Sequence, residues 1–98
     1  GLARDAETQP QVDASTKNLV LYAFRRCPLS VKVRRAIKRL SLNIETRDAK
    51  REPSSRKELL QGGGEIQVPC LRITDDQGNT TWMYESDAII EYLQARYA

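Results

Sequence analysis

The hydrophobic and polar positions of the chain divide it into seven short segments that predict alternating strands and helices. An unbroken apolar run at residues 19–24 is typical of a strand buried inside a sheet. From residue 28 to about residue 40, apolar residues recur at helical spacing with basic residues opposite them, which predicts an amphipathic helix. Alternating positions at residues 42–46 predict a second strand. A strand, helix and strand this close in sequence form a right-handed crossover between parallel strands.

A second, shorter helix is predicted to begin at residues 52–55, with Ser54 or Ser55 as its cap. It ends at three glycines, residues 62–64. This glycine run follows a helix and precedes a strand, which is the wrong order for a phosphate-binding loop. We therefore interpret the glycines as the end of a helix.

The last part of the chain predicts a β-hairpin and a final helix. Residues 66–73 and 80–84 predict two antiparallel strands, joined by a turn at residues 75–79. Pro69, at the start of the first of these strands, suits a sheet edge or a cis peptide at a sharp entry. Ser86 caps a helix whose apolar residues form one inward face. The predicted order is strand, helix, strand, helix, strand, strand, helix.

The chain has 98 residues, enough for one domain with a modest core. Residues 1–17 are polar and show no periodicity, so we expect a disordered arm or linker there, followed by a single folded domain at residues 18–98. Gly1 is not an initiator methionine, so we expect that the chain is processed or cut. No apolar stretch approaches the length of a membrane span.

The net charge of +3 is mild, but the basic residues concentrate at residues 25–39 and 47–57. Such a surface attracts nucleic acid, acidic lipid headgroups or anionic thiol substrates. The alternative, a solvated helix face, is favoured because no aromatic residues interleave with the charges, so we expect no nucleic-acid partner. The chain has no histidine, which excludes histidine-based zinc chemistry and every Cys-His nucleophile pair, and we expect no metal.

Cys27 is the candidate nucleophile, because it lies at the predicted corner between the first strand and the first helix. Pro28 then takes the first helical position, where its missing N–H costs nothing. Free backbone N–H groups and the helix dipole favour the thiolate there, and Arg25 and Arg26 act in the same direction. The surroundings of Cys70 instead predict a buried strand, so we interpret Cys70 as a small core residue and do not expect a disulfide.

Three motifs in this element order resemble the thioredoxin fold, most closely glutaredoxins and the N-terminal domain of glutathione transferases. Residues 27–30, Cys-Pro-Leu-Ser, resemble the Cys-Pro-x-Cys of glutaredoxins with serine as the last residue. They are equally similar to the Cys-Pro-x-Ala or Cys-Pro-x-Ser of omega-class transferases and their intracellular chloride channel relatives. Residues 68–69 resemble the cis-proline dipeptide of the superfamily, and residues 84–93 the transferase stretch Glu-Ser-x-Ala-Ile-x-x-Tyr-Leu.

The resemblance covers residues 18–98 and implies an α/β, thioredoxin-like fold of βαβαββα order. In that fold a mixed four-stranded sheet is flanked by three helices.

The resemblance also implies a glutathione site. Val68 would offer its backbone N–H and C=O to the cysteinyl part, with Pro69 in cis holding that backbone open beside the reactive cysteine. The Ser86 hydroxyl and the free N–H groups of the last helix would receive the γ-glutamyl carboxylate. Glu85, or Asp87, would face the γ-glutamyl amine. The alternative interpretations are a plain helix cap for Ser86 and a solvated turn residue for Glu85.

One part of the glutaredoxin pattern is missing from this sequence. Glutaredoxins often carry a lysine three residues before the cysteine, which binds the glycine carboxylate, and here that position is Phe24. Arg25, Arg26 or a basic residue such as Arg51 must substitute. We count Arg26 and Pro28 among the residues expected to contact glutathione.

Ser30 removes the resolving thiol, which leaves a monothiol cycle on Cys27. The sequence therefore predicts a glutathione-dependent thiol–disulfide oxidoreductase that acts on glutathionylated thiols, with glutathione as its cofactor. We expect the reducing compartment of the cytoplasm, because the cycle consumes reduced glutathione. We also expect a monomer. Iron–sulfur binding is not expected, since residues 28 and 29 depart from Cys-Gly-Phe-Ser.

Two other functions remain open at this point. One is a glutathione-binding module without turnover. The other is a docking domain that uses the basic face of the first helix, with contact to a membrane surface left open.

Overall fold

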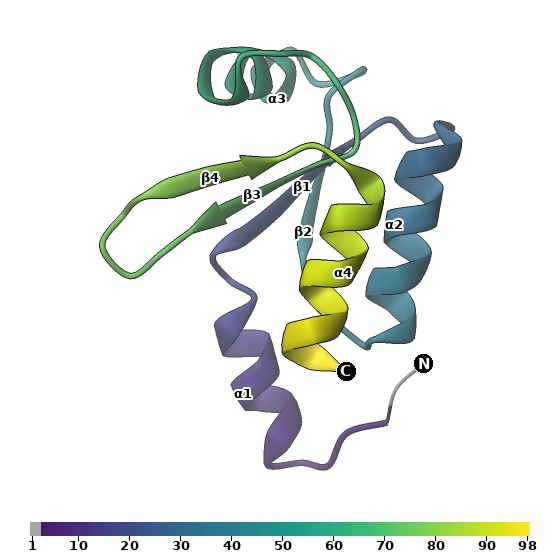
Figure 1. Cartoon of the computed structure of the whole chain (residues 1–98), viewed down its shortest axis with the longest axis vertical. Helices are drawn as coiled ribbons and strands as arrows, with labels where there is room; N and C mark the ends of the chain where they lie inside the picture. Colours follow the sequence, from purple (N-terminus) through teal and green to yellow (C-terminus); the bar gives the residue numbers. More distant parts are fainter. Residues whose placement is uncertain (1–2) are drawn as a thin grey trace.

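A four-stranded mixed sheet with strand order β2-β1-β3-β4 forms the centre of the molecule (Figure 1). The structure, a computed structural model, describes residues 3–98. The central strand β1 (Leu19–Ala23) is parallel to β2 (Glu45–Asp48) and antiparallel to β3 (Cys70–Thr74). At the edge, β4 (Thr80–Met83) pairs antiparallel with β3. This arrangement confirms the predicted α/β, thioredoxin-like sheet.

Two helices, α2 (Pro28–Arg39) and α4 (Ser86–Tyr97), cover one face of the sheet (Figure 1). The apolar residues of α2 recur every three or four positions, so they form one stripe that faces the strands. This layer contains the larger part of the core. Fully buried side chains in it are Leu21, Val33, Leu71, Ile89 and Leu93.

The opposite face is covered near one end by α3 (Pro53–Glu58), which continues into the π-helical segment η1 (Leu59–Gly63). Two of the three glycines there lie directly against aromatic side chains. A Cβ added to Gly62 would lie 2.0 Å from an atom of the Trp82 ring. The third glycine ends the helix in the left-handed conformation, with φ of 93°. The glycine run therefore both ends the helix and lets it approach the sheet closely.

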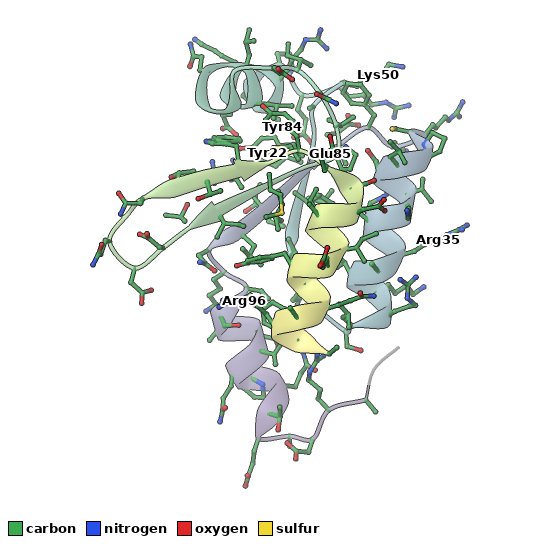
Figure 2. The ribbon with its side chains drawn as sticks, in the orientation of Figure 1. Tyr22, Arg35, Lys50, Tyr84, Glu85 and Arg96 are labelled. Carbon is green, nitrogen blue, oxygen red and sulfur yellow. The ribbon has the colours of Figure 1, made fainter. Side chains whose placement is uncertain are left out.

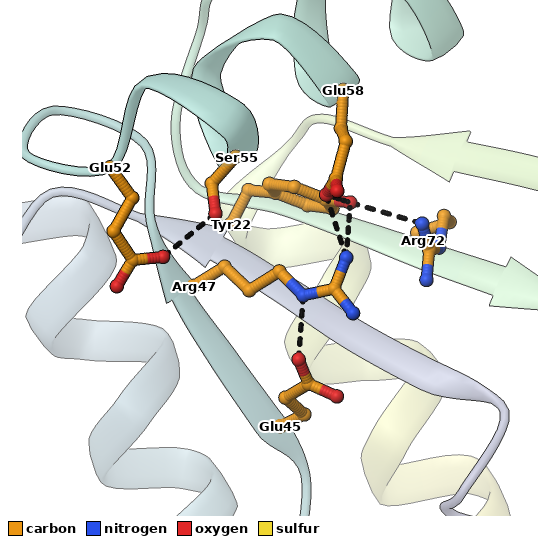
Figure 3. A network of polar contacts seen from close by, with 7 residues as sticks. All are labelled: Tyr22, Glu45, Arg47, Glu52, Ser55, Glu58 and Arg72. Atoms are coloured by element: carbon orange, nitrogen blue, oxygen red, sulfur yellow. Dashed lines mark hydrogen bonds and ion pairs between the residues drawn. The ribbon is translucent and has the colours of Figure 1, made fainter.

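A polar network attaches α3 to the sheet (Figure 3). The hydroxyl of the buried Tyr22 on β1 donates to Glu58 Oε1 at 2.8 Å, and the Arg47 guanidinium donates to the same oxygen at 2.6 Å. Arg72 on β3 donates to the Tyr22 hydroxyl at 3.1 Å. Hydrogen bonds from Tyr22 and then Arg47 hold the pKa of the Glu58 carboxyl below its usual range. The ionised Glu58 therefore ties α3 directly to β1 and β2, and through the Tyr22 hydroxyl to Arg72 on β3.

The expectation of a disordered arm at residues 1–17 is wrong for the described part of that segment. Residues 8–15 form a helix, α1 (Thr8–Ser15), and residues 1 and 2 lie outside the described residues. The Asp5 carboxylate accepts hydrogen bonds from the first backbone N–H groups of this segment. In residues 3–98, four α-helices therefore accompany the sheet, not the three that were predicted.

Polar contacts hold the N-terminal segment to the rest of the fold. The Arg4 guanidinium donates to the carbonyl of Leu40 and, at 2.6 Å, to the carbonyl of Tyr97. Thr16 is buried, and its hydroxyl donates to the Asn43 carbonyl at 3.0 Å. Helix α1 has no fully buried residue. Its sequence accordingly lacks the stripe of apolar residues from which an amphipathic helix is predicted.

Two helix caps differ from the predicted ones. Glu52, not Ser54 or Ser55, occupies the N-cap of α3, and the Ser55 hydroxyl donates to its carboxylate at 2.7 Å. Glu85 is the N-cap of α4, and Ser86 is the first helical residue. Within residues 3–98, no helix combines the length and apolar character that crossing a membrane requires.

Candidate thiol and glutathione site

Cys27 lies at the N-terminus of α2, directly after β1, where the sequence predicts it. Its backbone is extended (φ −67°, ψ 124°), and Pro28 follows in the first helical turn, where no N–H is needed. The Cys27 side chain is partly exposed, whereas Ser30, one turn on, is fully buried. The Ser30 hydroxyl accepts a hydrogen bond from the Phe24 N–H at 3.3 Å. The sulfur is thus exposed to solvent at the open end of a helix.

The pKa of the Cys27 thiol is lower than that of an ordinary cysteine. Burial acts to raise this pKa, but hydrogen bonds from the backbone N–H and hydroxyl of Ser30 and from the N–H of Leu29 outweigh it. These bonds belong to the first turn of α2 and to Ser30. They, and not the charges of Arg25 and Arg26, explain the shift, so the predicted contribution of those arginines is not needed.

Cys70, the other cysteine, lies fully buried in β3, as predicted. Burial raises the pKa of its thiol to about 12 even though a hydrogen bond with Tyr84 opposes the shift. Both cysteines are free thiols. Of the two thiols, Cys27 is therefore the candidate nucleophile, because thiolate character and access to solvent together determine cysteine reactivity.

A hollow of about 420 Å³ opens beside Cys27, between the end of β1 and the turn that follows β2. Asp48 holds that turn, because its carboxylate accepts hydrogen bonds from the N–H groups of Lys50 at 2.9 Å and Arg51 at 3.1 Å. These two bonds also hold the pKa of the Asp48 carboxyl below its usual range, and the bond from Arg51 has the larger effect. The lining consists of Cys27, Phe24 and Asp48 together with four cationic residues, Arg25, Arg26, Lys50 and Arg51.

Four other residues predicted for the site lie just before β3 or at the start of α4. The peptide bond between Val68 and Pro69 is cis, with Val68 half-buried and Pro69 fully buried. Glu85 is exposed at the start of α4, where Figure 2 labels it, and Ser86 is 8% exposed in the first turn of that helix.

An ion pair links α2 and α4 near their N-termini. Lys32 Nζ lies 2.6 Å from Asp87 Oδ1, with both side chains exposed. The N-termini of both helices therefore lie at the same end of the molecule, the end that also carries α3 (Figure 1). Free backbone N–H groups of two helices point toward this end, which suits a ligand with negative charges.

The structure brings Arg26 and Cys27 together in one hollow, along with Arg25 and Arg51, which the sequence offered as substitutes for the missing lysine. The remaining predicted contacts, Pro28, Val68, Pro69, Glu85 and Ser86, lie outside the lining of this hollow. The sequence analysis missed Lys50, Asp48 and Phe24 as lining residues. Parallel strands β1 and β2 end at the same edge of the sheet, so residues at the end of one strand lie near those at the end of the other. This rule could have predicted that the two groups line one hollow.

Residues 3–98 contain no gathering of three or more acidic, cysteine or histidine side chains able to hold a metal ion. The donors at the site suit an organic anion instead.

A mixed sheet of order β2-β1-β3-β4, with a cysteine at the N-terminus of the first crossover helix, defines a thioredoxin-like protein. The chain belongs to the glutathione S-transferase N-terminal domain family, whose model matches residues 21–98. Comparison with curated protein sequences finds no significant match.

Several solved structures are similar in fold. A mutant of the thioredoxin-like protein BC3987 is 23% identical with a TM-score of 0.62, covering 80% of this chain and 96% of that protein. Maleylacetoacetate isomerase from Anaeromyxobacter dehalogenans 2CP-1, with dicarboxyethyl glutathione and citrate bound in its active site, is 28% identical with a TM-score of 0.63. Glutathione transferase Omega 2C from Trametes versicolor is 19% identical with a TM-score of 0.65.

The two larger structures differ from this chain in length. The alignment with the isomerase covers 82% of this chain but 37% of that protein, and the alignment with the omega transferase covers 82% and 38%. This chain therefore corresponds to a little over a third of each.

Proposed function

We propose that this protein is a glutathione-dependent thiol–disulfide oxidoreductase that removes glutathione from mixed disulfides through Cys27. The observation that carries this proposal is the lowered pKa of a partly exposed Cys27 thiol beside a hollow lined by four cations. Membership of the transferase N-terminal domain family and the glutathione derivative bound to the similar isomerase support glutathione as the ligand.

The cationic hollow is the proposed site for the glycine carboxylate of glutathione. Arg25 and Arg26 come from the loop after β1, and Lys50 and Arg51 come from the turn after β2. A carboxylate that enters between them receives charge-assisted hydrogen bonds from either side. This arrangement performs the role of the lysine that is absent at residue 24.

The rest of the tripeptide is proposed to lie across the cis peptide toward α4. The half-buried Val68 pairs its backbone with the cysteinyl part. Ser86 and the free N–H groups at the start of α4 receive the γ-glutamyl carboxylate, and the exposed Glu85 pairs with the γ-glutamyl amine. The glutathione sulfur then lies next to Cys27.

The proposed reaction is two consecutive thiol–disulfide exchanges. First, the Cys27 thiolate attacks the glutathionyl sulfur of a mixed disulfide, and the substrate sulfur leaves as a thiolate that takes a proton from water. Next, the thiolate of a second glutathione attacks the glutathionyl sulfur on Cys27, which releases oxidised glutathione and restores the Cys27 thiolate. Each step breaks one S–S bond and forms one. Because residue 30 is serine, no neighbouring thiol intercepts the intermediate.

The reduction of hydroxyethyl disulfide by glutathione tests this function. We expect turnover by the natural chain, none above the uncatalysed rate for Cys27→Ser, and turnover retained by Cys70→Ala, since Cys70 is buried away from solvent. Binding of glutathione by the natural chain without turnover would instead show a binding module. Absence of both would overturn the glutathione site altogether.

A further inference from the structure

We infer that the positive surface around Cys27 selects glutathionylated proteins whose modified cysteine lies in an acidic stretch of chain. This inference rests on the proposed function and names its substrate class. The surface, which we call the cationic collar, combines the four basic residues of the hollow with two on the exposed side of α2. Its members are Arg25, Arg26, Lys50, Arg51, Arg35 and Lys38.

The collar carries more positive charge than glutathione neutralises. Four cations in the hollow face one carboxylate, that of Asp48, which already accepts two backbone hydrogen bonds. Glutathione brings one carboxylate to this side of Cys27. The ion pairs within residues 3–98 involve Lys32 and Arg47 as cations and none of the collar residues. A surplus of cations therefore surrounds the reactive sulfur.

The collar extends from the hollow along α2. The Arg34 guanidinium donates to the Arg25 carbonyl at 2.9 Å, so the loop beside the hollow adjoins this helix face, and Lys38 lies one turn further along the same face. Figure 2 shows Lys50 near the end of the molecule that carries α3, and Arg35 projecting outward from α2 below it. At 1.5 Å per residue, α2 places Arg35 about 12 Å and Lys38 about 16 Å from Cys27 along the axis.

These lengths define the reach of a bound partner. An extended chain advances about 3.3 Å per residue, so acidic residues within about five positions of a glutathionylated cysteine reach the collar. Leu29, next to Cys27, is 51% exposed and offers an apolar contact close to the reacting sulfurs. Complementary charge raises association rates by about tenfold or more at low ionic strength.

A protein partner fits the collar better than nucleic acid or a membrane. Phe24 is the one aromatic residue that lines the hollow, and it is half-buried, packing with Trp82 and Tyr84 against the core layer under α3. The collar therefore has no row of exposed aromatic side chains on which successive bases could stack. Leu29 is the one large apolar side chain exposed near Cys27, which is too little to insert into lipid. The proposed reaction also requires a partner with a sulfur that reaches Cys27, which a protein has and a nucleic acid or a lipid does not.

Two glutathionylated peptides test the inference. They share one sequence but carry either glutamates or lysines within about five positions of the cysteine. We expect kcat/KM for the acidic peptide to exceed that for the basic peptide by about tenfold at an ionic strength of about 0.01 M and to approach it at about 1 M. Equal rates at low salt, with hydroxyethyl disulfide turned over normally, would overturn the inference but leave the proposed function intact. No turnover of hydroxyethyl disulfide would overturn the function itself.

Charge reversal locates the effect. We expect the double substitution Arg35→Glu, Lys38→Glu to lower the preference for the acidic peptide several-fold. The matched control is Lys17→Glu, which reverses an exposed charge before the start of β1, at the end of that strand remote from Cys27. Loss of preference in both variants, or in neither, would contradict the assignment to the collar. Tight binding to anionic phosphatidylserine vesicles or to single-stranded RNA, without discrimination between the peptides, would assign the collar to those partners instead.

Discussion

Ser30, which the sequence resemblance matches to the second cysteine of dithiol glutaredoxins, makes two interactions with its side chain. Its hydroxyl accepts a hydrogen bond from the Phe24 N–H, and it hydrogen-bonds the Cys27 sulfur so that the pKa of Cys27 falls. The residue that removes the second thiol thus also favours the first thiolate. A buried hydroxyl with both interactions satisfied is a stable part of the turn.

The substitution Ser30→Ala therefore tests the origin of the thiolate. We expect the pKa of Cys27 to rise, because one stabilising hydrogen bond is lost while the backbone N–H groups remain. The pH dependence of iodoacetamide alkylation measures this pKa, and the rate at neutral pH should fall. Ser54→Ala, at an exposed position of α3, is the matched control. An unchanged alkylation profile in Ser30→Ala would show that the hydroxyl has no such role.

Cys70 gives a pH dependence of stability. Its folded-state pKa of about 12 lies above the unfolded value of about 8.5, so between these values the unfolded chain binds fewer protons and stability falls as pH rises. We expect Cys70→Ala to remove a slope of up to about 1.4 kcal/mol per pH unit in the free energy of unfolding. Urea denaturation between about pH 8.5 and about pH 10 measures it, below the range in which tyrosines dominate.

The matched control is Cys27→Ala. The lowered pKa of Cys27 acts in the opposite direction: stability rises with pH through the unfolded value of about 8.5 and then levels off, so Cys27 adds no falling slope in this alkaline range. If Cys27→Ala changed the pH dependence of the free energy of unfolding as much as Cys70→Ala does, the slope would not be due to Cys70.

Helix α3 is attached to the sheet by the network of Figure 3, in which the Glu58 carboxylate contacts side chains from β1 and β2. Glu58 accepts from Tyr22 and Arg47, and it is the only residue of α3 in that network besides Ser55, which bonds to the N-cap Glu52. Since Glu58 is partly exposed, solvent screens its ion pair, and the hydrogen bonds contribute most of its effect.

We expect Glu58→Gln to lower the free energy of unfolding by about 1 kcal/mol, because the charge that strengthens two hydrogen bonds is removed. Hydrogen exchange of the α3 amides should accelerate along with this loss. Glu65→Gln, an exposed carboxylate outside the network, is the control. If the α3 amides of both Glu58→Gln and Glu65→Gln exchange at the rate of the natural chain, then apolar contacts alone hold α3 on the sheet.

Elements with a local signal could be predicted from the sequence. The apolar run gave β1 within one residue of its end, and Pro28 with the helical spacing after it gave the start of α2. Strand β2 was placed too early, because Leu42 and Ile44 are apolar yet pack on the core before pairing begins. Its register against β1 starts at Glu45, and pairing with another strand leaves no trace in a local pattern.

The candidate site could be predicted in part for the same reason. Cys27 and the helix turn that lowers its pKa are adjacent in sequence, so residues 27–30 alone predict this chemistry. The hollow joins residues after β1 to Asp48 at the end of β2 and Lys50 just after it, and the Tyr22–Glu58 contact spans 36 positions. Such groupings depend on which strands are neighbours. Helix α1 escaped prediction because polar contacts hold it and no apolar stripe marks it.

The molecule has its thiol site at one end of β1 and the N-terminal helix at the other (Figure 1). Arg4 joins the end of α2 to the end of α4 through the carbonyls of Leu40 and Tyr97. The N-terminal segment therefore closes the end of the fold that is remote from Cys27.

Deletion of residues 1–15 tests whether that segment contributes to stability without contributing to the reaction. We expect the free energy of unfolding to fall by about 1–3 kcal/mol, from the loss of a few hydrogen bonds, with hydroxyethyl disulfide turnover at low temperature unchanged. Thermal unfolding and the turnover assay measure the two effects. Unaltered stability would show that α1 does not dock, and lost turnover in a folded chain would show that it acts on the site.

The most direct measurement is the covalent state of each cysteine after incubation with oxidised glutathione, by mass spectrometry of the intact chain and of its peptides. We predict a single glutathionyl group, carried by Cys27 and removed by excess reduced glutathione, with Cys70 unmodified. An unmodified Cys27, or a glutathionyl group carried on Cys70 instead, would contradict the assignment of Cys27 as the thiol that accepts glutathione.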